Sequence, residues 1–160
     1  MTTASIALTS DAFADGATMP DASLLERGNT SPALRWTGVP AGTKSLALAV
    51  HDPDAPTTVG FTHWILFDLD PALTGLAAGA GKHGANPPGS IHGLTDFGQR
   101  EYGGPAPPPG DPPHRYHVTL YALDVPKLAG AGDALTYPRF RFMIRGHILA
   151  EGTLTGRYGR

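Results

Sequence analysis

The segment Gly103–Tyr116 constrains the fold of this chain more than any other stretch of sequence. It reads GGPAPPPGDPPHRY. Proline fixes the φ angle and lacks a backbone N–H, so this segment can neither form a helix nor lie inside a sheet. We therefore predict a stiff loop, and a stiff loop loses little entropy when it forms the wall of a binding site.

The loop leads directly into an expected strand, HRYHVTLYALD. Because alternate residues of a strand share a face, His114 and Tyr116 point the same way as the apolar Val118 and Leu120. A polar pair at the start of an apolar strand face is typical of the rim of a pocket. The alternative interpretation is a proline-rich surface turn that carries a structural histidine.

The composition favours a single β domain, which we assign to residues 1–160. The 21 glycines and 16 prolines lie between apolar runs, which indicates a mainly β protein rich in turns. Only 16% of residues are charged, the net charge is −2, and Lys and Arg are scattered, so no nucleic-acid partner is expected. The chain has no cysteine, which excludes disulfides, thiolate nucleophiles and zinc–thiolate sites.

The amino-terminal sequence MTTASIALTSDAF has neither a basic region nor an apolar core of the kind found in secretory signals. No apolar run approaches the ~20 residues needed to cross a bilayer. The expectation is a cytoplasmic protein without integral membrane association.

Two strands are clearest in the first half of the chain, Ser45–Asp52 and His63–Asp70. Alternation predicts the following shared faces: Leu46, Leu48, Val50 and Asp52 in the first strand, and His63, Ile65, Phe67 and Leu69 in the second. The simplest antiparallel register pairs Val50 with Ile65, and Asp52 with His63. A carboxylate and an imidazole would then face each other at the end of an apolar ladder.

The remaining elements are expected as follows: strands at 4–9, Ala33–Thr37, Tyr116–Leu123 and Glu151–Tyr158, loops at Pro71–Gly81 (with one turn of helix) and Lys82–Arg100, and a helix within Asp133–Ala150. The helix is predicted because Phe140, Met143, Ile144 and His147 recur at helical spacing, with Pro138 near its start.

Taken together, the motifs HDPDAP, FTHWILF, YGGPAPPPG and HRYHVTLYALD resemble the phosphatidylethanolamine-binding protein family. The resemblance extends over SPALRW, VPAGTKSLALAV and GHILAEGTLTGRYGR, and is nearest to the bacterial branch described as Raf-kinase-inhibitor-like. It implies a central antiparallel sheet packed on a smaller sheet, with a few short helices. It also implies a small pocket that takes anions such as phosphate or phosphoryl head groups.

The resemblance further implies which residues form that pocket. The ligand-binding residues would be Asp52, His63, Ala106, Pro107, Pro108, His114 and Tyr116, with Asp54, Pro56 and Trp64 in support. The bond between Ala55 and Pro56 is a candidate cis peptide. No cofactor and no metal are implied.

Three departures from the family pattern stand out. His51 replaces the acidic residue that usually precedes the DPDAP motif, and Ala106 replaces a common cysteine, which removes a redox switch. Nothing after Tyr158 corresponds to the carboxy-terminal helix of eukaryotic relatives, which weakens the expectation of phospholipid binding and Raf-type inhibition.

The residues leave the chemistry open between three classes. The first is a binding protein for a small anion or phosphoryl group, in which Asp52 either holds a histidine as imidazolium or is itself protonated. The second is a regulator that inhibits a kinase or protease through its surface, and the third is a hydrolase of phosphoryl or acyl substrates. A protein partner and a homodimer are compatible with all three classes.

Two further expectations concern the histidines. Asp52, His63 and His114 share the composition of some iron and zinc sites, yet no metal is predicted. If both histidines titrate near ~6.5, affinity for sulfate should grow as the pH falls, and His114→Gln should flatten that dependence.

Overall fold

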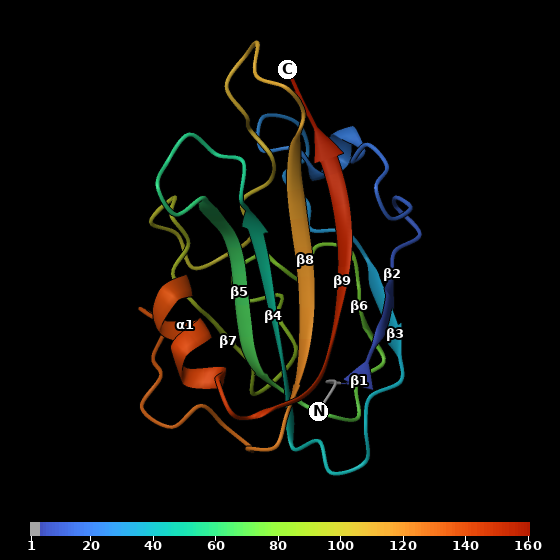
Figure 1. Ribbon diagram of the computed structural model, residues 1–160, viewed down its shortest axis with the longest axis vertical. Coiled ribbons are helices and arrows are strands. Elements are labelled where there is room, and N and C mark those ends of the chain that lie inside the picture. Colours follow the sequence, from blue (N-terminus) through green and yellow to red (C-terminus); the bar gives the residue numbers. More distant parts are fainter. Residues whose placement is uncertain (1–3) are drawn as a thin grey trace.

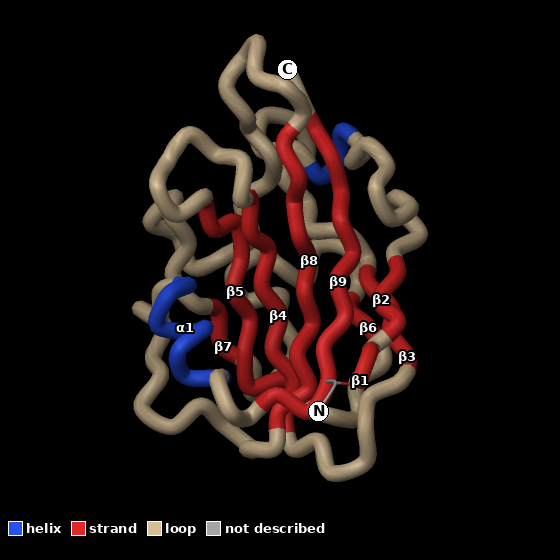
Figure 2. Tube along the Cα trace, in the orientation of Figure 1, coloured by secondary structure: helices blue, strands red, loops and turns tan. Residues whose placement is uncertain are grey.

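The computed structural model describes residues 4–160, in two layers of β-sheet with one helix on the outer face (Figure 1). The six-stranded sheet has the order β1-β9-β8-β4-β5-β7, and the three-stranded sheet has the order β2-β3-β6. The elements are β1 Ala4–Ser5, β2 Ala7–Thr9, a 3₁₀ turn at Asp21–Ser23, β3 Leu34–Thr37, β4 Ser45–Asp52, β5 Phe61–Leu69, β6 Gly75–Leu76, β7 Ile91–His92, β8 His114–Leu123, α1 Tyr137–Ile144 and β9 Ile148–Tyr158. The predicted mainly β fold is confirmed. Figure 2 shows how little of the chain is helical.

The strands follow the alternation of the sequence closely. β4 has the predicted bounds, and β8 begins two residues earlier than expected, at His114. β8 pairs with β4 on one side and with β9 on the other, so it lies in the middle of the large sheet. Its central position explains why its inward-facing residues are apolar.

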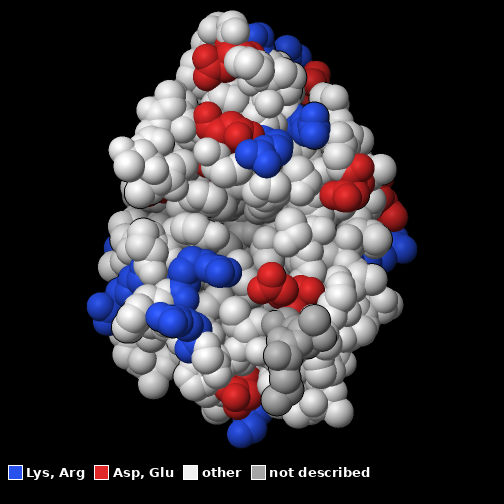
Figure 3. Space-filling view, viewed as in Figure 1, with Lys and Arg blue, Asp and Glu red and all other residues white. Residues whose placement is uncertain are grey.

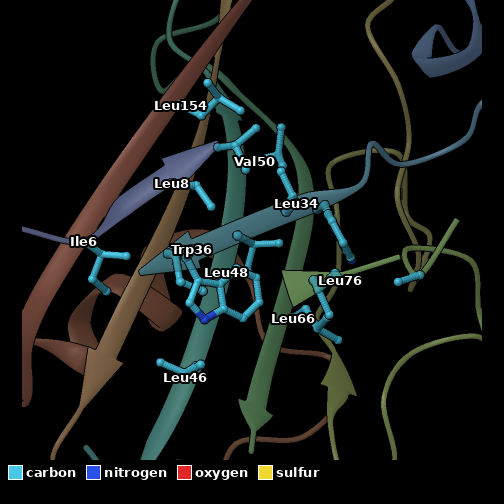
Figure 4. Packing of buried hydrophobic residues seen from close by; sticks show 14 of the residues in the cluster. Ile6, Leu8, Leu34, Trp36, Leu46, Leu48, Val50, Leu66, Leu76 and Leu154 are labelled. Atoms are coloured by element: carbon cyan, nitrogen blue, oxygen red, sulfur yellow. The ribbon is translucent and has the colours of Figure 1, made fainter. Parts of the chain in front are cut away.

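Two hydrophobic clusters cover the two faces of the large sheet. The first lies between the two sheets and includes Trp36, Leu48 and Leu66 (Figure 4). The second lies between the large sheet and α1, where Phe140 and Ile144 are fully buried. Every buried strand of the large sheet therefore contributes alternate side chains to two different cores.

The helix is shorter than its apolar spacing predicted. α1 ends at Ile144, and Gly146 has a φ of 85°, which leads the chain out of the helix and into β9 at Ile148. His147, expected on the helix, lies beyond it and hydrogen-bonds through Nδ1 to Asp124 at 2.8 Å. Sequence periodicity could not reveal that the last residues of the predicted helix range, from Ile148 onwards, pair with β8 instead.

The predicted loops contain short strands. β6 lies within Pro71–Gly81, where the expected helical turn is absent, and β7 lies within Lys82–Arg100. Each is two residues long and forms the edge of its sheet, β6 next to β3 and β7 next to β5. Two-residue strands are too short to show a period, which is why the sequence did not indicate them.

The register of β4 and β5 differs from the predicted one. Val50 pairs with Trp64 and Asp52 pairs with Phe61, not with His63. The pairing is interrupted twice, between Leu46 and Leu48 and between Val50 and His51. An extra residue in one strand moves the following side chains to the other face. Leu69 accordingly joins the first cluster, although Ile65 and Phe67 belong to the second.

Two other features of residues 4–160 bear on the predictions. No cis peptide bond occurs among them, so the bond between Ala55 and Pro56 is trans. No helix in this part of the chain has the length and apolar character that crossing a bilayer requires. On the face drawn in Figure 3, Lys and Arg stand in separate groups interspersed with Asp and Glu.

Candidate functional site

A cavity of about 320 Å³ opens at the end of the large sheet where β4 ends and β5 and β8 begin. In Figure 1 this is the upper end, beneath the loop that precedes β8. The lining residues are Asp52, Ala55, Pro56, Thr57, Phe61, His63, Phe97, Ala106, Pro107, Pro108, His114 and Tyr116. All seven residues predicted to bind ligand are therefore brought together here, with Pro56 beside them.

A β-bulge places His63 in this cavity. β5 pairs with β4 through Thr62 and Trp64, and His63 between them has no partner. Strict alternation would put the imidazole on the face of Ile65, which packs under α1. The bulge instead turns it towards Tyr116, whose ring lies edge-on at 5.1 Å between centroids.

His114 is held between two carboxylates. Its Nδ1 donates to Asp52 Oδ2 at 2.7 Å, and its Nε2 donates to Asp111 Oδ2 at 3.0 Å. Because an ionised carboxylate can only accept, two such contacts favour the imidazolium form of the ring, in which both nitrogens carry a proton. Burial lowers the pKa of His114, but the hydrogen bonds that the ring donates to Asp52 and Asp111 outweigh this effect, and the pKa lies above 6.5.

Asp52 uses both of its oxygens within the protein. Oδ2 accepts from His114, and Oδ1 accepts from the backbone N–H of Asp54 at 2.8 Å, which closes the turn after β4. The side chains of Asp52 and His114 are each 3% exposed. Of the two roles open to Asp52, this geometry favours that of a carboxylate that holds a histidine in its charged form.

His63 differs from His114 in its charge state. Its Nδ1 donates to the carbonyl of Gly103 at 2.7 Å, which fixes that nitrogen as protonated and leaves Nε2 for the cavity. Burial lowers the pKa of His63 below 6.5, and the carbonyl of Gly103 and the charge of Asp52 offset only part of that effect. The two histidines therefore titrate on opposite sides of 6.5, and the prediction of similar values is wrong.

Tyr116 contributes an unsatisfied group. Its hydroxyl is buried and has no hydrogen-bond partner among residues 4–160. Burial raises the pKa of Tyr116 strongly, and the nearby charge of Asp52 raises it further, so the phenol stays protonated. A buried hydroxyl without a partner costs about 1–3 kcal/mol, and a ligand oxygen in the cavity would remove that cost.

The proline-rich loop forms one wall, as predicted. Ala106, Pro107 and Pro108 line the cavity, and the carbonyl of Pro107 accepts from Arg160 Nε at 2.6 Å. The start of the loop is held by Gly103, whose N–H donates to His63 O, and by Gly104, whose N–H donates to Asn29 Oδ1. The loop is therefore anchored at both ends.

The supporting residues divide into two groups. Asp54 closes the turn through its N–H, while its carboxylate forms a bidentate pair with Arg115 that lowers the pKa of Asp54 to about 2. Trp64 is buried in the core and donates from Nε1 to His92 Nδ1 at 3.1 Å. Trp64 does not line the cavity, because it alternates with Ile65 and shares the face of Leu66, which packs between the two sheets.

Sequence reasoning missed several residues of the site, Thr57 among them. Phe61 and Phe97 form an aromatic wall with ring centroids 4.7 Å apart, and Phe97 lies in a loop without any periodicity. Asp111 was visible in GDPPHRY only as a loop residue three positions before His114. That spacing was the one signal that could have pointed to the contact.

No group of three or more His, Cys, Asp or Glu side chains within residues 4–160 is arranged to hold a metal ion. Asp52 and Asp111 occupy the two nitrogens of His114, and a carbonyl occupies Nδ1 of His63, so three of the four ring nitrogens already have partners within the protein. The expectation of a metal-free site stays a prediction.

Known proteins resemble this chain over nearly its whole length. The family model described as phosphatidylethanolamine-binding protein matches residues 9–159. A UPF0098 protein of Methanothermobacter thermautotrophicus is 41% identical over 157 residues, which cover 96% of this chain and 98% of that protein. UPF0098 protein YbcL of Escherichia coli is 39% identical over 138 residues, which cover 83% of this chain and 73% of YbcL.

Solved structures agree with the sequence matches. The crystal structure of Escherichia coli YbcL, whose authors call it a new member of the mammalian PEBP family, superposes with a TM-score of 0.93 at 34% identity and covers 97% of this chain and 98% of YbcL. The homologue CT736 from Chlamydia trachomatis gives a TM-score of 0.84 at 34% identity, with 98% of both chains covered. The chain belongs to the phosphatidylethanolamine-binding protein family.

Proposed function

We propose that this protein binds a small oxyanion, such as a phosphoryl group, in the cavity between His63 and Tyr116. The observation that carries the proposal is the buried Tyr116 hydroxyl, which lacks a partner and lies in a cavity lined by a second potential donor, His63. Both groups would donate to the same oxyanion, and charge-assisted hydrogen bonds to an anion are stronger than neutral ones.

The charges around the cavity decide how binding depends on pH. His114 has a pKa above 6.5, and Asp52 and Asp111 already occupy both of its ring nitrogens. His63 must gain a proton at Nε2 before that nitrogen can donate to an anion, because Nδ1 donates to Gly103 O. Affinity should therefore rise as the pH falls through the free-state pKa of His63, which lies below 6.5. The expected pH dependence is therefore assigned to His63 alone and no longer to both histidines.

A sulfate titration by calorimetry tests the proposal, because sulfate stays divalent over the range used. We expect the affinity of the wild type to increase about tenfold between about pH 7.5 and about pH 5.5. His63→Gln cannot ionise and should bind weakly with a flat pH profile. Tyr116→Phe should weaken binding about tenfold at every pH, because it removes a donor and leaves the ring in place.

His83→Gln serves as the matched control, because it removes an exposed histidine that lies outside the cavity. The proposal is wrong if sulfate binds equally well to His63→Gln and Tyr116→Phe as to the wild type.

The other two function classes have separate readouts. A hydrolase would turn over phosphoester or ester substrates, and His114→Ala would abolish the turnover. A regulator that acts through its surface would inhibit its kinase or protease target even when Tyr116→Phe has weakened the cavity. Neither class is favoured by a specific feature of the site.

A further inference from the structure

We propose that Asp111 is a built-in competitor for this anion site. Its carboxylate accepts a hydrogen bond from Nε2 of His114. An anion can bind Nε2 only by displacing this carboxylate. The inference rests on the proposed function for the class of ligand, and adds to it a contact that limits affinity.

The first step concerns which nitrogen of His114 a ligand could reach. Nδ1 donates to Asp52, and both side chains are almost fully buried. An anion that displaced Asp52 would leave a buried carboxylate without its partner, which is strongly unfavourable. Asp52 also accepts from the N–H of Asp54, so its departure would open the turn after β4. Nε2 is therefore the nitrogen left for a ligand.

The second step is that Asp111 occupies Nε2 in the structure. The two atoms are 3.0 Å apart, and only Pro112 and Pro113 separate the two residues in the chain. Proline restricts the backbone, so the carboxylate stays close to the imidazolium at a high effective concentration. An external anion must compete with this internal one.

The carboxylate of Asp111 can move from His114 into a hollow on the surface. Its side chain is 37% exposed. It lines, together with Arg115 and Arg157, a hollow of about 520 Å³ on the outer side of His114. Asp54 already neutralises Arg115, whereas Arg157 makes no ion pair within residues 4–160. Arg157 also lies directly opposite Arg115 on the neighbouring strand, where like charges are unfavourable, so a carboxylate moving outward gains a cation.

If Asp111 is a competitor, its substitution should increase the affinity for sulfate. A merely structural role of Asp111 would not produce this increase. In Asp111→Asn the acceptor loses its negative charge, and in Asp111→Ala the acceptor is gone. We expect both variants to bind sulfate about tenfold more tightly than the wild type at about pH 7 in low salt. Asp11→Asn makes the same change of charge at an exposed carboxylate paired with Arg35, and should leave the affinity within about twofold.

A second measurement separates displacement from a general effect of charge. In the wild type, saturating sulfate should shift the carboxyl ¹³C resonance of Asp111, because the carboxylate leaves the imidazolium. The resonance of Asp11 should stay in place. Competition is refuted if the Asp111 resonance does not move while sulfate saturates the site, or if Asp111→Asn and Asp111→Ala bind sulfate no better than the wild type.

Sulfate binding by His63→Gln, compared with binding by the Asp111 variants, distinguishes the competitor role from the proposed function. If His63→Gln weakens binding and the Asp111 variants do not strengthen it, the proposed function stands and the competitor role falls. If the Asp111 variants gain binding that His63→Gln does not reduce, the competitor role stands and the proposed role of His63 falls. If no variant binds sulfate, both are wrong.

Discussion

At the scale of single residues, the site depends on two histidines with opposite charge states. His114 lies between Asp52 and Asp111, whereas His63 faces a carbonyl and is buried. The same residue type thus has a pKa raised above 6.5 in one position and lowered below 6.5 in the other. Only the neighbours differ, and they set the charge.

The raised pKa of His114 predicts how its contribution to stability changes with pH. A group whose folded-state pKa exceeds its unfolded value of 6.5 stabilises the protein fully below 6.5. That contribution is lost as the pH rises through the folded-state value. The difference in unfolding free energy between the wild type and His114→Gln should therefore shrink between about pH 6 and about pH 9 in urea titrations. A difference that stays constant over this range would show that His114 is not the charged partner of Asp52.

At the scale of elements, the glycines that anchor the proline-rich loop make a sharp test. A Cβ at Gly104 would lie 2.0 Å from the carbonyl oxygen of Ser23, a backbone atom that cannot move aside. We expect Gly104→Ala to cost about 2 kcal/mol or more. Gly110→Ala, at a φ of 89° with open space around it, should cost about 1 kcal/mol through backbone strain alone.

Urea titrations of both glycine variants give the comparison. Gly104→Ala should also weaken sulfate binding, because the residue before it accepts from His63 Nδ1. Equal losses of stability in the two variants would contradict the close approach of the loop to Ser23.

The helix α1 offers a second matched pair. Phe140 is fully buried between α1 and the large sheet, whereas Phe142, two residues further on, is 76% exposed. Phe140→Ala should lower the free energy of unfolding by about 3–5 kcal/mol. Phe142→Ala should change it by no more than about 0.5 kcal/mol. Similar losses of stability in the two variants would contradict the assignment of Phe140, and not Phe142, to the face of α1 that packs on the sheet.

At the scale of the whole molecule, buried histidines set the response to acid. Burial lowers the pKa values of His51, His63, His92 and His117 below 6.5. The unfolded chain then binds more protons than the folded one once the pH falls below about 6.5, so stability must decrease there. The melting temperature should be lower at about pH 5 than at about pH 7. His92→Gln, which keeps a hydrogen-bonding group next to Trp64, should reduce this difference. A wild-type melting temperature that is the same at both pH values would contradict the role of these histidines in acid sensitivity.

The sequence by itself determined the long strands, the class of fold and seven of the residues that line the cavity. The apolar run in SLALAVHD predicts the bounds of β4 to the residue. A strand buried on both faces is apolar along its length, and its alternate side chains enter two different cores. The stiff proline-rich segment forms a wall of the cavity, because proline geometry is covalent and needs no tertiary contact.

Tertiary structure alone decided how the site residues face one another. The side of the sheet on which His63 lies depends on a bulge, and a bulge depends on how two strands pair over many residues. The end of α1 depends on the pairing of Ile148 with β8. The charge of His114 depends on Asp52, 62 residues away in the chain, and on Asp111 across a proline turn. These contacts, and the desolvation that shifts each pKa, exist only after the chain has folded. No local sequence pattern could therefore predict them.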